Sequence, residues 1–301
     1  MLNPMVPYSL QPVDTLLLNG EKLDSFITST ERNLDLKTVQ SFGEEWSAFH
    51  NFSKQEIQKI GNDYFDLLTI DSSNFVALDV GCGSGRWSLY LSPRVKFIEA
   101  IDPSSAVWVA KKLLKDLKNI RVTQASVEHL PFSDNAFDLV YSLGVLHHVP
   151  NTSSAIQHCF EKTKHGGYFL LYLYYNHENR GFVFRFIFRC SNLLRKIISI
   201  FPLGLKKVTC NLIATLIYWP LAKLSTIVAF FSISWASKLP LSYYKKTSFF
   251  VMRNDALDRF GTPLEKRFSK SEINKMLTQV GFVNIQFSPH EPYWHVLAQK
   301  P

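Results

Sequence analysis

Three glycines at alternate positions are the residues of this chain best suited to hold a ligand. Gly81, Gly83 and Gly85 come directly after the apolar run 76–80, Val-Ala-Leu-Asp-Val. Without a Cβ atom, glycine takes positive φ angles and lets backbone N–H groups approach a bound molecule closely. A helix beginning near Arg86 would add the positive end of its dipole. The pattern predicts a site for a nucleotide-like ligand.

The spacing of this loop separates it from the related dinucleotide pattern G-x-G-x-x-G. Arg86 stands where that pattern has its third glycine, and Asp79 precedes the first glycine by two residues. A carboxylate there would repel a pyrophosphate and would face a cationic group or the loop's own amides. We therefore expect a ligand other than a dinucleotide, which makes a nicotinamide dehydrogenase the weaker alternative.

A second acid, Asp102, ends the apolar run 95–101 and precedes Pro103. A carboxylate at such a strand end can accept hydrogen bonds from both hydroxyls of a ribose. The glycine loop and Asp102 together resemble the class I S-adenosylmethionine-dependent methyltransferases, in which the loop holds the amino-acid part of the cofactor and the acid holds the ribose. The alternative is that Asp102 only caps the helix that follows.

Residues 122–132 and 137–150 extend the resemblance. The first segment is similar to the third-strand region of these enzymes, which implies that Ser126 and Val127 meet the adenine. Many relatives carry Asp where this chain has Ser126, and a hydroxyl bonds an amine without charge assistance. The second segment resembles the fourth strand and following loop of the subgroup that includes quinone-biosynthesis methyltransferases. The resemblance implies S-adenosyl-L-methionine as cofactor, bound by Asp79, Gly81, Cys82, Gly83, Ser84, Gly85, Asp102, Pro103, Ser126, Val127, Ser142 and Leu143.

His147 and His148 are the candidate catalytic residues. They follow the fourth expected strand, at the carboxyl edge where ligands bind in open α/β sheets. A sulfonium methyl is already a good electrophile, so positioning supplies much of the acceleration, and a general base helps if the acceptor is a hydroxyl. We expect one histidine to face the substrate and the other to pack or cap the next helix. Further candidates are Tyr174, Tyr175, His290 and His295.

Apolar runs alternate with amphipathic ones, which predicts a doubly wound parallel sheet. The whole pattern is that of a Rossmann-like α/β fold of about seven strands, and the resemblance implies that the last strand is antiparallel. A final helix is expected to stop at Gly281. The expected strands are 76–80, 95–101, 119–124, 137–142, 167–175, 282–287 and 293–299, and the expected helices are 104–117, 152–163 and 270–280.

Four regions follow from this reading. Residues 1–74 are expected to form an N-terminal helical cap, 75–175 the cofactor-binding core, 176–254 a helical insertion, and 255–301 the closing part of the core. Within the first region the segment from Ser41 to Phe49, which includes Trp46, either caps the cofactor cleft or packs against the sheet. Within the last, the charged stretch 255–268 either shapes the acceptor pocket or forms surface ion pairs.

The positive charge of the chain is concentrated in the insertion. The whole sequence has 33 basic and 25 acidic residues, a net charge of +8. Twelve of the basic residues and none of the acidic ones lie between Glu178 and Asp255. The remainder therefore holds 21 basic residues against 25 acidic ones. Three interpretations stay open for 181–236: an element that contacts a membrane surface or lipid substrate, a lid buried on its own domain or in a dimer, and an integral anchor.

Composition bounds the remaining possibilities. The cysteines at positions 82, 159, 190 and 210 form no C-x-x-C pair, which argues against a zinc site or a disulfide framework, and no metal is expected. No signal peptide is evident at the N-terminus, so the expected location is cytoplasmic, peripheral at the inner face of the membrane if the insertion contacts lipid. The basic residues are interleaved with Phe, Ile and Leu, which disfavours a nucleic-acid partner. The sequence predicts no particular oligomeric state.

The expected activity is transfer of a methyl group from S-adenosylmethionine to a small or lipid-linked acceptor, at oxygen or carbon. The alternative from a different class is a non-catalytic protein that binds S-adenosylmethionine and uses the insertion as a membrane or partner module. Both would keep the glycine loop and Asp102. Methyl turnover would separate them.

Overall fold

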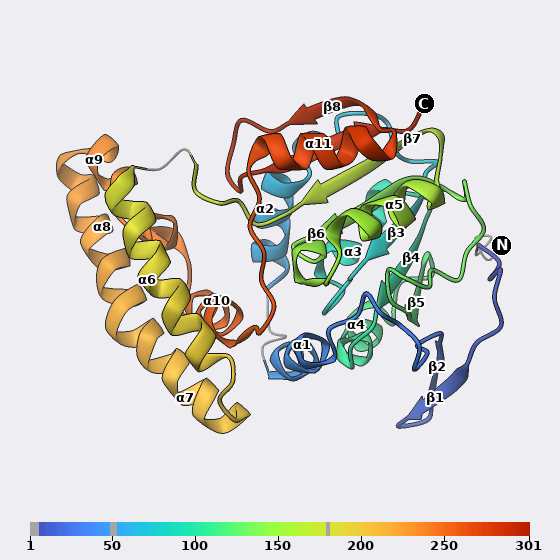
Figure 1. The fold of residues 1–301 in the computed structure, drawn as a ribbon, viewed down its shortest axis with the longest axis horizontal. Helices are drawn as coiled ribbons and strands as arrows, with labels where there is room; N and C mark the ends of the chain where they lie inside the picture. The colour runs from blue at the N-terminus through green and yellow to red at the C-terminus, as the bar shows by residue number, and fades with distance from the viewer. Residues whose placement is uncertain (1–5, 49–52, 179–180) are drawn as a thin grey trace. The chain divides into compact units, whose positions relative to one another are not determined.

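The computed structural model describes residues 6–48, 53–178 and 181–301, and Figure 1 shows their fold. The chain divides into two compact units: residues 1–178 with 264–301 form unit 1, and residues 179–263 form unit 2. Unit 2 corresponds to the expected insertion 176–254 but extends further along the chain. The difference is helix α10 (Phe249–Gly261), which packs on α6 and α7 of unit 2.

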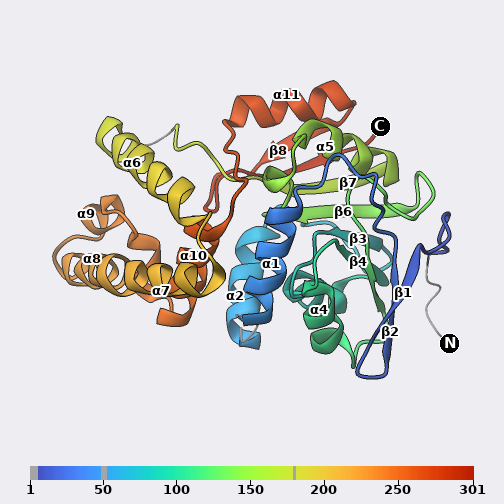
Figure 2. The ribbon, with the colours of Figure 1, turned by 60° about the horizontal axis from the view of Figure 1, so that its bottom comes forward.

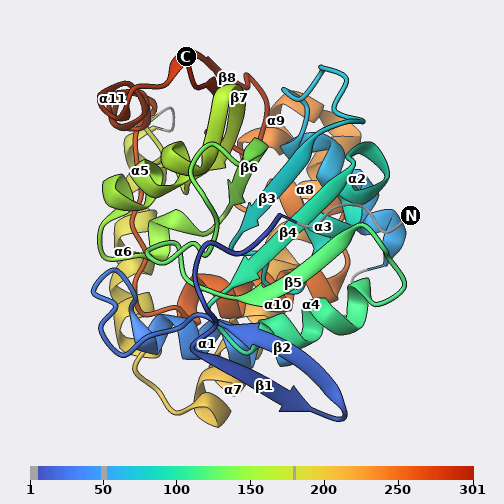
Figure 3. The ribbon, with the colours of Figure 1, turned by 90° about the vertical axis from the view of Figure 1, so that its right-hand side faces the viewer.

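Unit 1 is built on one nine-stranded sheet with the order β1-β2-β5-β4-β3-β6-β7-β9-β8. Figure 3 labels every strand of this sheet except β9. Strands β5, β4, β3, β6 and β7 are parallel, and β9 lies antiparallel between β7 and β8. The strands are β1 (Asp14–Leu18), β2 (Glu21–Ser25), β3 (Val76–Val80), β4 (Phe97–Asp102), β5 (Ile120–Gln124), β6 (Phe137–Leu143), β7 (Thr163–Tyr172), β8 (Val283–Phe287) and β9 (His295–Gln299).

The seven expected strands and the antiparallel last strand are confirmed. The hairpin β1–β2 was not predicted, and it joins the edge strand β5 through the single pair Ser25–Gln124. Its turn is Asn19-Gly20, with φ angles of 51° and 81°. Positive φ at both positions is what a two-residue hairpin turn requires, and Asn-Gly supplies it at low cost. That dipeptide was the signal available in the sequence.

Helices cover both faces of the sheet and bury a separate apolar core on each. One core joins the sheet to α5 and α11 through residues such as Ile156 and Leu277, and the other joins it to α2, α3 and α4 through residues such as Trp87 and Leu114. Because the central strands are buried on both faces, their sequences are almost uniformly apolar. The helices of unit 1 are α1 (Leu36–Ala48), α2 (Lys54–Tyr64), α3 (Arg86–Leu91), α4 (Ala106–Leu114), α5 (Thr152–Lys162) and α11 (Lys270–Val280).

The helix boundaries near the C-terminus follow from local sequence. Ser269 and Glu272 form a reciprocal capping box at the start of α11, and Gly281, with φ of 113°, ends it as expected. In the N-terminal region the segment 41–48 lies within α1. Phe49 and the side chain of Trp46 lie outside the described part of the structure, so the two interpretations of that segment stay open.

Unit 2 consists of helices. Figure 2 shows α7 and α8 as one long rod, because a π-helical turn at Ala214–Tyr218 joins them into a continuous helix, Leu203–Phe231. This helix is long and apolar enough to cross a membrane by length and composition alone, which is weak evidence for a span. The helices are α6 (Phe182–Ile198), α7 (Leu203–Ile213), α8 (Trp219–Phe231), α9 (Ile233–Lys238) and α10, with a short 3-10 turn, η4 (Ser242–Lys246).

Candidate active site

The glycine loop lies between β3 and α3 and takes the conformation that its composition favours. Gly81, Gly83 and Gly85 have φ angles of 82°, 52° and 82°. The N–H groups of Gly81 and Cys82 both donate to the carbonyl of Ile101 at 2.8 Å, which ties the loop to the end of β4. The φ angles place all three glycines in the left-handed region that other residues rarely adopt.

Asp102 ends β4 and lies directly against this loop. Its Oδ2 accepts the backbone N–H of Gly83 at 2.9 Å, and its Oδ1 accepts both the N–H and the hydroxyl of Ser104, at 2.8 and 2.6 Å. Burial raises the pKa of the carboxyl, and these hydrogen bonds oppose that shift. A carboxylate has about four acceptor positions, so three protein donors leave one open. The acid and the loop predicted separately from sequence therefore form one hydrogen-bonded site.

Asp79 has different partners from those expected. Its Oδ2 accepts the hydroxyl of Ser88 at 2.6 Å, and the hydroxyl of Tyr141 also hydrogen-bonds it. The expectation of a cationic partner or the loop's amides was wrong, because the side chain points into the core between β3, α3 and β6. Burial raises the pKa of Asp79 to about 7. Asp79 thus joins the start of α3 to the sheet beneath the glycine loop.

The other predicted cofactor residues lie at the same edge of the sheet. Strands β3 to β6 are parallel, so the residues that follow their carboxyl ends share that edge. Ser126 and Val127 follow β5 and are buried, and the Ser126 hydroxyl accepts the N–H of Glu128 at 3.2 Å. Ser142, beside Leu143 at the end of β6, donates its hydroxyl to the Val80 carbonyl at 2.8 Å.

His147 and His148 lie in the 3-10 turn η2 (Leu146–His148), and their ring centroids are 4.0 Å apart. The N–H of Tyr174 donates to Nδ1 of His147 at 3.4 Å, so the ring proton of His147 is on Nε2. Nδ1 of His148 lies 2.6 Å from the carbonyl oxygen of Leu264 and must donate to it, which leaves the lone pair of the neutral ring on Nε2. The two rings are therefore opposite tautomers.

The environment of His147 keeps its ring neutral. It is fully buried and stacks on Tyr174, with ring centroids 3.8 Å apart, and its Nε2 is buried with no hydrogen-bond partner among the described residues. Burial lowers its pKa well below the ordinary value, and the positive charge of Arg267, with that of His148 when His148 is protonated, lowers it further. A buried N–H group without a hydrogen-bond partner costs free energy. Nε2 of His147 is therefore a donor that could bond an acceptor atom of a ligand.

The stretch 255–268 does not act as a single loop. Its first part is the end of α10, and its last part packs on the histidine turn, where Lys266 donates its N–H to the His147 carbonyl at 3.0 Å. Glu265 and Arg267 form an ion pair at 2.9 Å, and the Arg267 guanidinium lies 5.0 Å from the centre of the Tyr174 ring. This segment is therefore part of the wall around His147 and His148, and ion pairing occurs within it.

Sequence reasoning missed a contact made by a short segment of the N-terminal region, Arg32 with Asn33, which we call the strap. The N–H groups of Arg32 and Asn33 both donate to Oε2 of Glu128, at 2.8 and 2.7 Å, and the Asn33 amide donates to the Asn151 carbonyl at 2.9 Å. These contacts hold the strap against the loop that carries Ser126. They join residues about a hundred positions apart, and no local pattern in the sequence marks them.

One group of side chains in the described structure has metal-ligating types. Single ligand atoms of Glu31, Glu128 and His129 lie within 4.8 Å of one another, and His129 Nδ1 is 3.7 Å from a Glu31 oxygen. The last pair is an ion pair when His129 is protonated.

His295 was a further candidate for catalysis. It bonds Asp66 at 2.6 Å and the Pro292 carbonyl at 2.7 Å, so both of its ring nitrogens are engaged within the fold.

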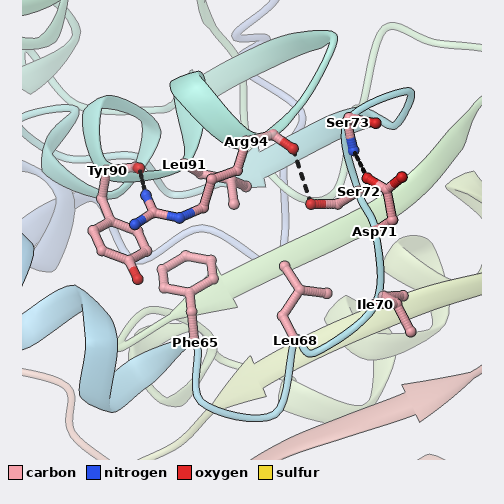
Figure 4. A pocket seen from close by; sticks show the side chains of 9 residues that line it. All are labelled: Phe65, Leu68, Ile70, Asp71, Ser72, Ser73, Tyr90, Leu91 and Arg94. Atoms are coloured by element: carbon pink, nitrogen blue, oxygen red, sulfur yellow. Dashed lines mark hydrogen bonds between the residues drawn. The ribbon is translucent and has the colours of Figure 1, made fainter.

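Figure 4 shows a pocket elsewhere in unit 1, with a volume of about 320 Å³. Arg94 lies over the Tyr90 ring at 4.1 Å, and the Ser72 hydroxyl donates to the Arg94 carbonyl at 2.9 Å. Its lining residues precede β3 and β4, so it opens at the amino edge of the sheet, opposite the glycine loop. It is therefore separate from the candidate site. The lining is Phe65, Leu68, Ile70, Asp71, Ser72, Ser73, Tyr90, Leu91 and Arg94.

Comparison with known proteins identifies the central part of unit 1. Residues 78–171 match the family described as "Methyltransferase domain". They form a class I methyltransferase domain. The match runs from β3 to β7 and contains the glycine loop, Asp102 and the histidine turn, and the cofactor of this class is S-adenosylmethionine. A glycine loop bonded to an acid at the carboxyl edge fits that cofactor, because Asp102 keeps one acceptor position for a hydroxyl beside the loop.

Curated relatives of the methyltransferase domain share this central region. An uncharacterized methyltransferase of Bacillus subtilis is 32% identical over 105 residues, 34% of this chain and 42% of that protein. A ubiquinone biosynthesis O-methyltransferase of Pseudomonas fluorescens is 37% identical over 93 residues, 30% of this chain and 40% of that protein. The chain thus spans about two fifths of the length of these relatives.

A solved structure, a putative methyltransferase from Bacillus halodurans, is 19% identical with a TM-score of 0.47 and covers 75% of this chain and 70% of its own.

Proposed function

We propose that this protein transfers the methyl group of S-adenosylmethionine to an oxygen or carbon atom of a small or lipid-linked acceptor. The observation that carries the proposal is the glycine loop bonded through Gly83 to Asp102, with the histidine turn at the same sheet edge. The bound cofactor supplies an electrophilic sulfonium methyl group. The task left to the protein is to hold the acceptor in line with it and to receive the acceptor's proton.

Each predicted cofactor residue has a role in this proposal. The loop from Gly81 to Gly85, with Cys82 and Ser84, lies against the amino-acid part. Asp102, beside Pro103, accepts a ribose hydroxyl with its open position. Ser126 and Val127 line the adenine, and Ser142 with Leu143 forms the adjoining strand end. Asp79 is a positioning residue, since its hydroxyl partners fix α3 rather than a ligand.

The opposite tautomers of the histidine pair assign them different roles. Nε2 of His148 carries the lone pair and takes the proton from an acceptor hydroxyl as its oxygen bonds the methyl carbon. The bound cofactor would supply the methyl group and would leave as the neutral thioether, so the only proton to be received is the one that His148 takes. Nε2 of His147 keeps its proton and donates a hydrogen bond to the acceptor, which removes the cost of its unpartnered state. The pair therefore supplies one base and one donor.

The acceptor class rests on two observations. The similar protein from Pseudomonas fluorescens is an O-methyltransferase of ubiquinone biosynthesis, which favours a hydroxyl on a lipid-linked ring. The insertion 181–236 is basic and apolar, which suits a cytoplasmic protein held peripherally at the inner face of a membrane. The alternative, a non-catalytic S-adenosylmethionine-binding protein, keeps the same cofactor site without turnover.

Methyl transfer can be tested with cofactor labelled in its methyl group. The purified full chain is incubated with a prenylated hydroquinone in vesicles and, separately, with a soluble catechol. We expect label in at least one acceptor and, for His148→Gln, a kcat lowered by about a hundredfold with cofactor affinity kept. His165→Gln is the matched control, because His165 is exposed and bonds only the chain terminus among the described contacts.

Two results would contradict this account of the site. Cofactor binding without label transfer to either acceptor class would support the non-catalytic alternative. Full activity in His148→Gln would remove the assignment of the base while leaving methyl transfer intact.

A further inference from the structure

The long helix of unit 2, Leu203–Phe231, buries a polar side and exposes an apolar one, which is the reverse of the arrangement in a water-soluble protein. Its buried side is a narrow row of small and polar residues: Lys206, Cys210, Ala214, Tyr218, Ala222 and Ser225. Its exposed side carries nearly all of its bulky apolar residues: Leu205, Val208, Leu212, Leu216, Ile217, Trp219, Leu224, Ile227, Phe230 and Phe231. A soluble amphipathic helix buries the second kind and exposes the first.

The interior of unit 2 explains why the polar row is buried. The Arg195 guanidinium donates to the carbonyls of Thr262 and Pro263 at 2.8 and 3.0 Å, and Ser225 donates to the Ala236 carbonyl at 3.1 Å. The Tyr218 ring packs against Tyr244 with centroids 5.3 Å apart. Polar and aromatic contacts therefore hold the long helix in unit 2, and the bulky aliphatic residues that unit 2 buries, such as Ile198, Val251 and Leu257, come from α6 and α10.

Two other parts of unit 2 also expose apolar residues. At the turn between α8 and α9, Phe230 and Phe231 are 85% and 86% exposed, and Ile233 and Trp235 are exposed beside them. Helix α6 exposes a further apolar row, Phe182, Phe186, Leu193 and Ile197, and Ile200 is exposed just beyond its end. We call these residues and the exposed side of the long helix the apolar face. An exposed apolar surface of this extent marks a contact site.

The charge of unit 2 selects the occupant. No acidic residue lies between Glu178 and Asp255, and the exposed cations Arg185, Arg189 and Lys196 follow α6 at helical spacing beside its apolar row. A second copy of the chain would bring two clusters of the same sign together. An anionic bilayer offers hydrocarbon for the apolar residues and negative headgroups for the cations.

We propose that the apolar face docks unit 2 onto an anionic lipid bilayer, lying in the interface with the α8–α9 turn inserted. A transverse span is disfavoured because exposed Lys223 would then face hydrocarbon near the middle of the helix. This inference rests on the proposed function in one respect only: docking would give the protein access to a lipid-linked acceptor. Docking itself is independent of methyl transfer.

Sedimentation of the full chain with vesicles tests the docking. We expect binding to phosphatidylglycerol-containing vesicles at least tenfold tighter than to phosphatidylcholine vesicles, and release by high salt and by alkaline carbonate. The double variant Phe230→Ser/Phe231→Ser should weaken binding at least tenfold. The matched control is Leu17→Ser/Leu36→Ser, which removes two leucines of unit 1 that are 69% and 71% exposed and should leave binding unchanged.

The outcomes separate docking from the proposed function. Equal sedimentation with and without anionic vesicles, or unchanged binding by the Phe230/Phe231 variant, overturns the docking whatever the catalytic result. Self-association without vesicle binding assigns the face to a second copy and also overturns it. Resistance to carbonate extraction overturns the interfacial placement. Cofactor titration of the same variant, expected to match the wild type, shows that unit 1 is folded and leaves methyl transfer to its own assay.

Discussion

At the scale of single residues, the candidate site depends on where protons are held. His147 and His148 are neighbours in sequence, yet Tyr174 donates to one ring and the other ring donates to Leu264. The sequence predicted that the two histidines would differ in role but could not say which would be the base. The hydrogen-bond partners that decide it come from the residues just after β7 and from the segment after unit 2, far along the chain.

The raised pKa of the buried Asp79 predicts how the stability of the protein depends on pH. Its folded-state pKa is about 7, against about 3.9 for an unfolded Asp, so the folded protein holds a proton that the unfolded chain has lost between these values. The free energy of unfolding should therefore fall as pH rises from about 4 to 7 and level off above. For this group the full difference is on the order of 4 kcal/mol.

Asp79→Asn should flatten this dependence, because the amide cannot ionise and still offers an oxygen to Ser88. Urea unfolding at pH 5 and pH 8 measures it. Asp102 and Glu99, whose pKa values burial also raises, are present in both proteins and cancel in the comparison. An identical pH dependence in the two proteins would show that Asp79 is ionised in the folded state.

At the scale of elements, a substitution in the glycine loop should destabilise the fold in two ways, through backbone strain and through a steric clash. A Cβ at Gly81 would lie 2.4 to 2.9 Å from the Val145 side chain, and its φ is 82°. Gly166 has a similar φ of 76° but open space around it. Gly166→Ala should therefore report the cost of positive φ alone, roughly 1 kcal/mol, and Gly81→Ala that cost plus the clash.

We expect Gly81→Ala to lose at least twice as much unfolding free energy as Gly166→Ala and to bind S-adenosylmethionine more weakly. Gly166→Ala should keep the affinity of the wild type. Chemical denaturation and calorimetric titration measure the two effects. Equal losses in both variants would mean that the loop yields around Val145 and that its close packing contributes little.

The elements that the sequence predicted are those with strong local patterns. The central strands are mostly apolar, and α11 has both a capping box and a terminal glycine, so its bounds were predicted correctly. The strap through Arg32 and Asn33 was missed because its contacts are non-local. Glu99 in β4 was also hidden: it is buried among apolar neighbours and accepts two bonds from Arg121, at 2.7 and 2.8 Å.

At the scale of the whole molecule, the two units differ in how their helices are oriented to solvent. Unit 1 has two aliphatic and aromatic cores, whereas the long helix of unit 2 buries small and polar residues and exposes part of the apolar face. The sequence predicted a helical insertion that is basic but could not tell which side of 203–231 would be buried. That side was decided by α10 and η4, against which the long helix packs.

The most direct test of the central claim is calorimetric titration of the full chain with S-adenosylmethionine, comparing the wild type with Asp102→Asn and using NADH as the control ligand. Asn keeps an acceptor for the Gly83 N–H but loses the charge that strengthens bonds to ribose hydroxyls, a loss of about 1.5 to 3 kcal/mol. The account predicts binding of S-adenosylmethionine that the variant weakens by roughly ten- to a hundredfold, no binding of NADH, and a lower thermal unfolding temperature, because the Asn amide NH2 would face the Ser104 N–H that Oδ1 of Asp102 accepts. Equal affinity in the two proteins, or preference for NADH, would contradict it.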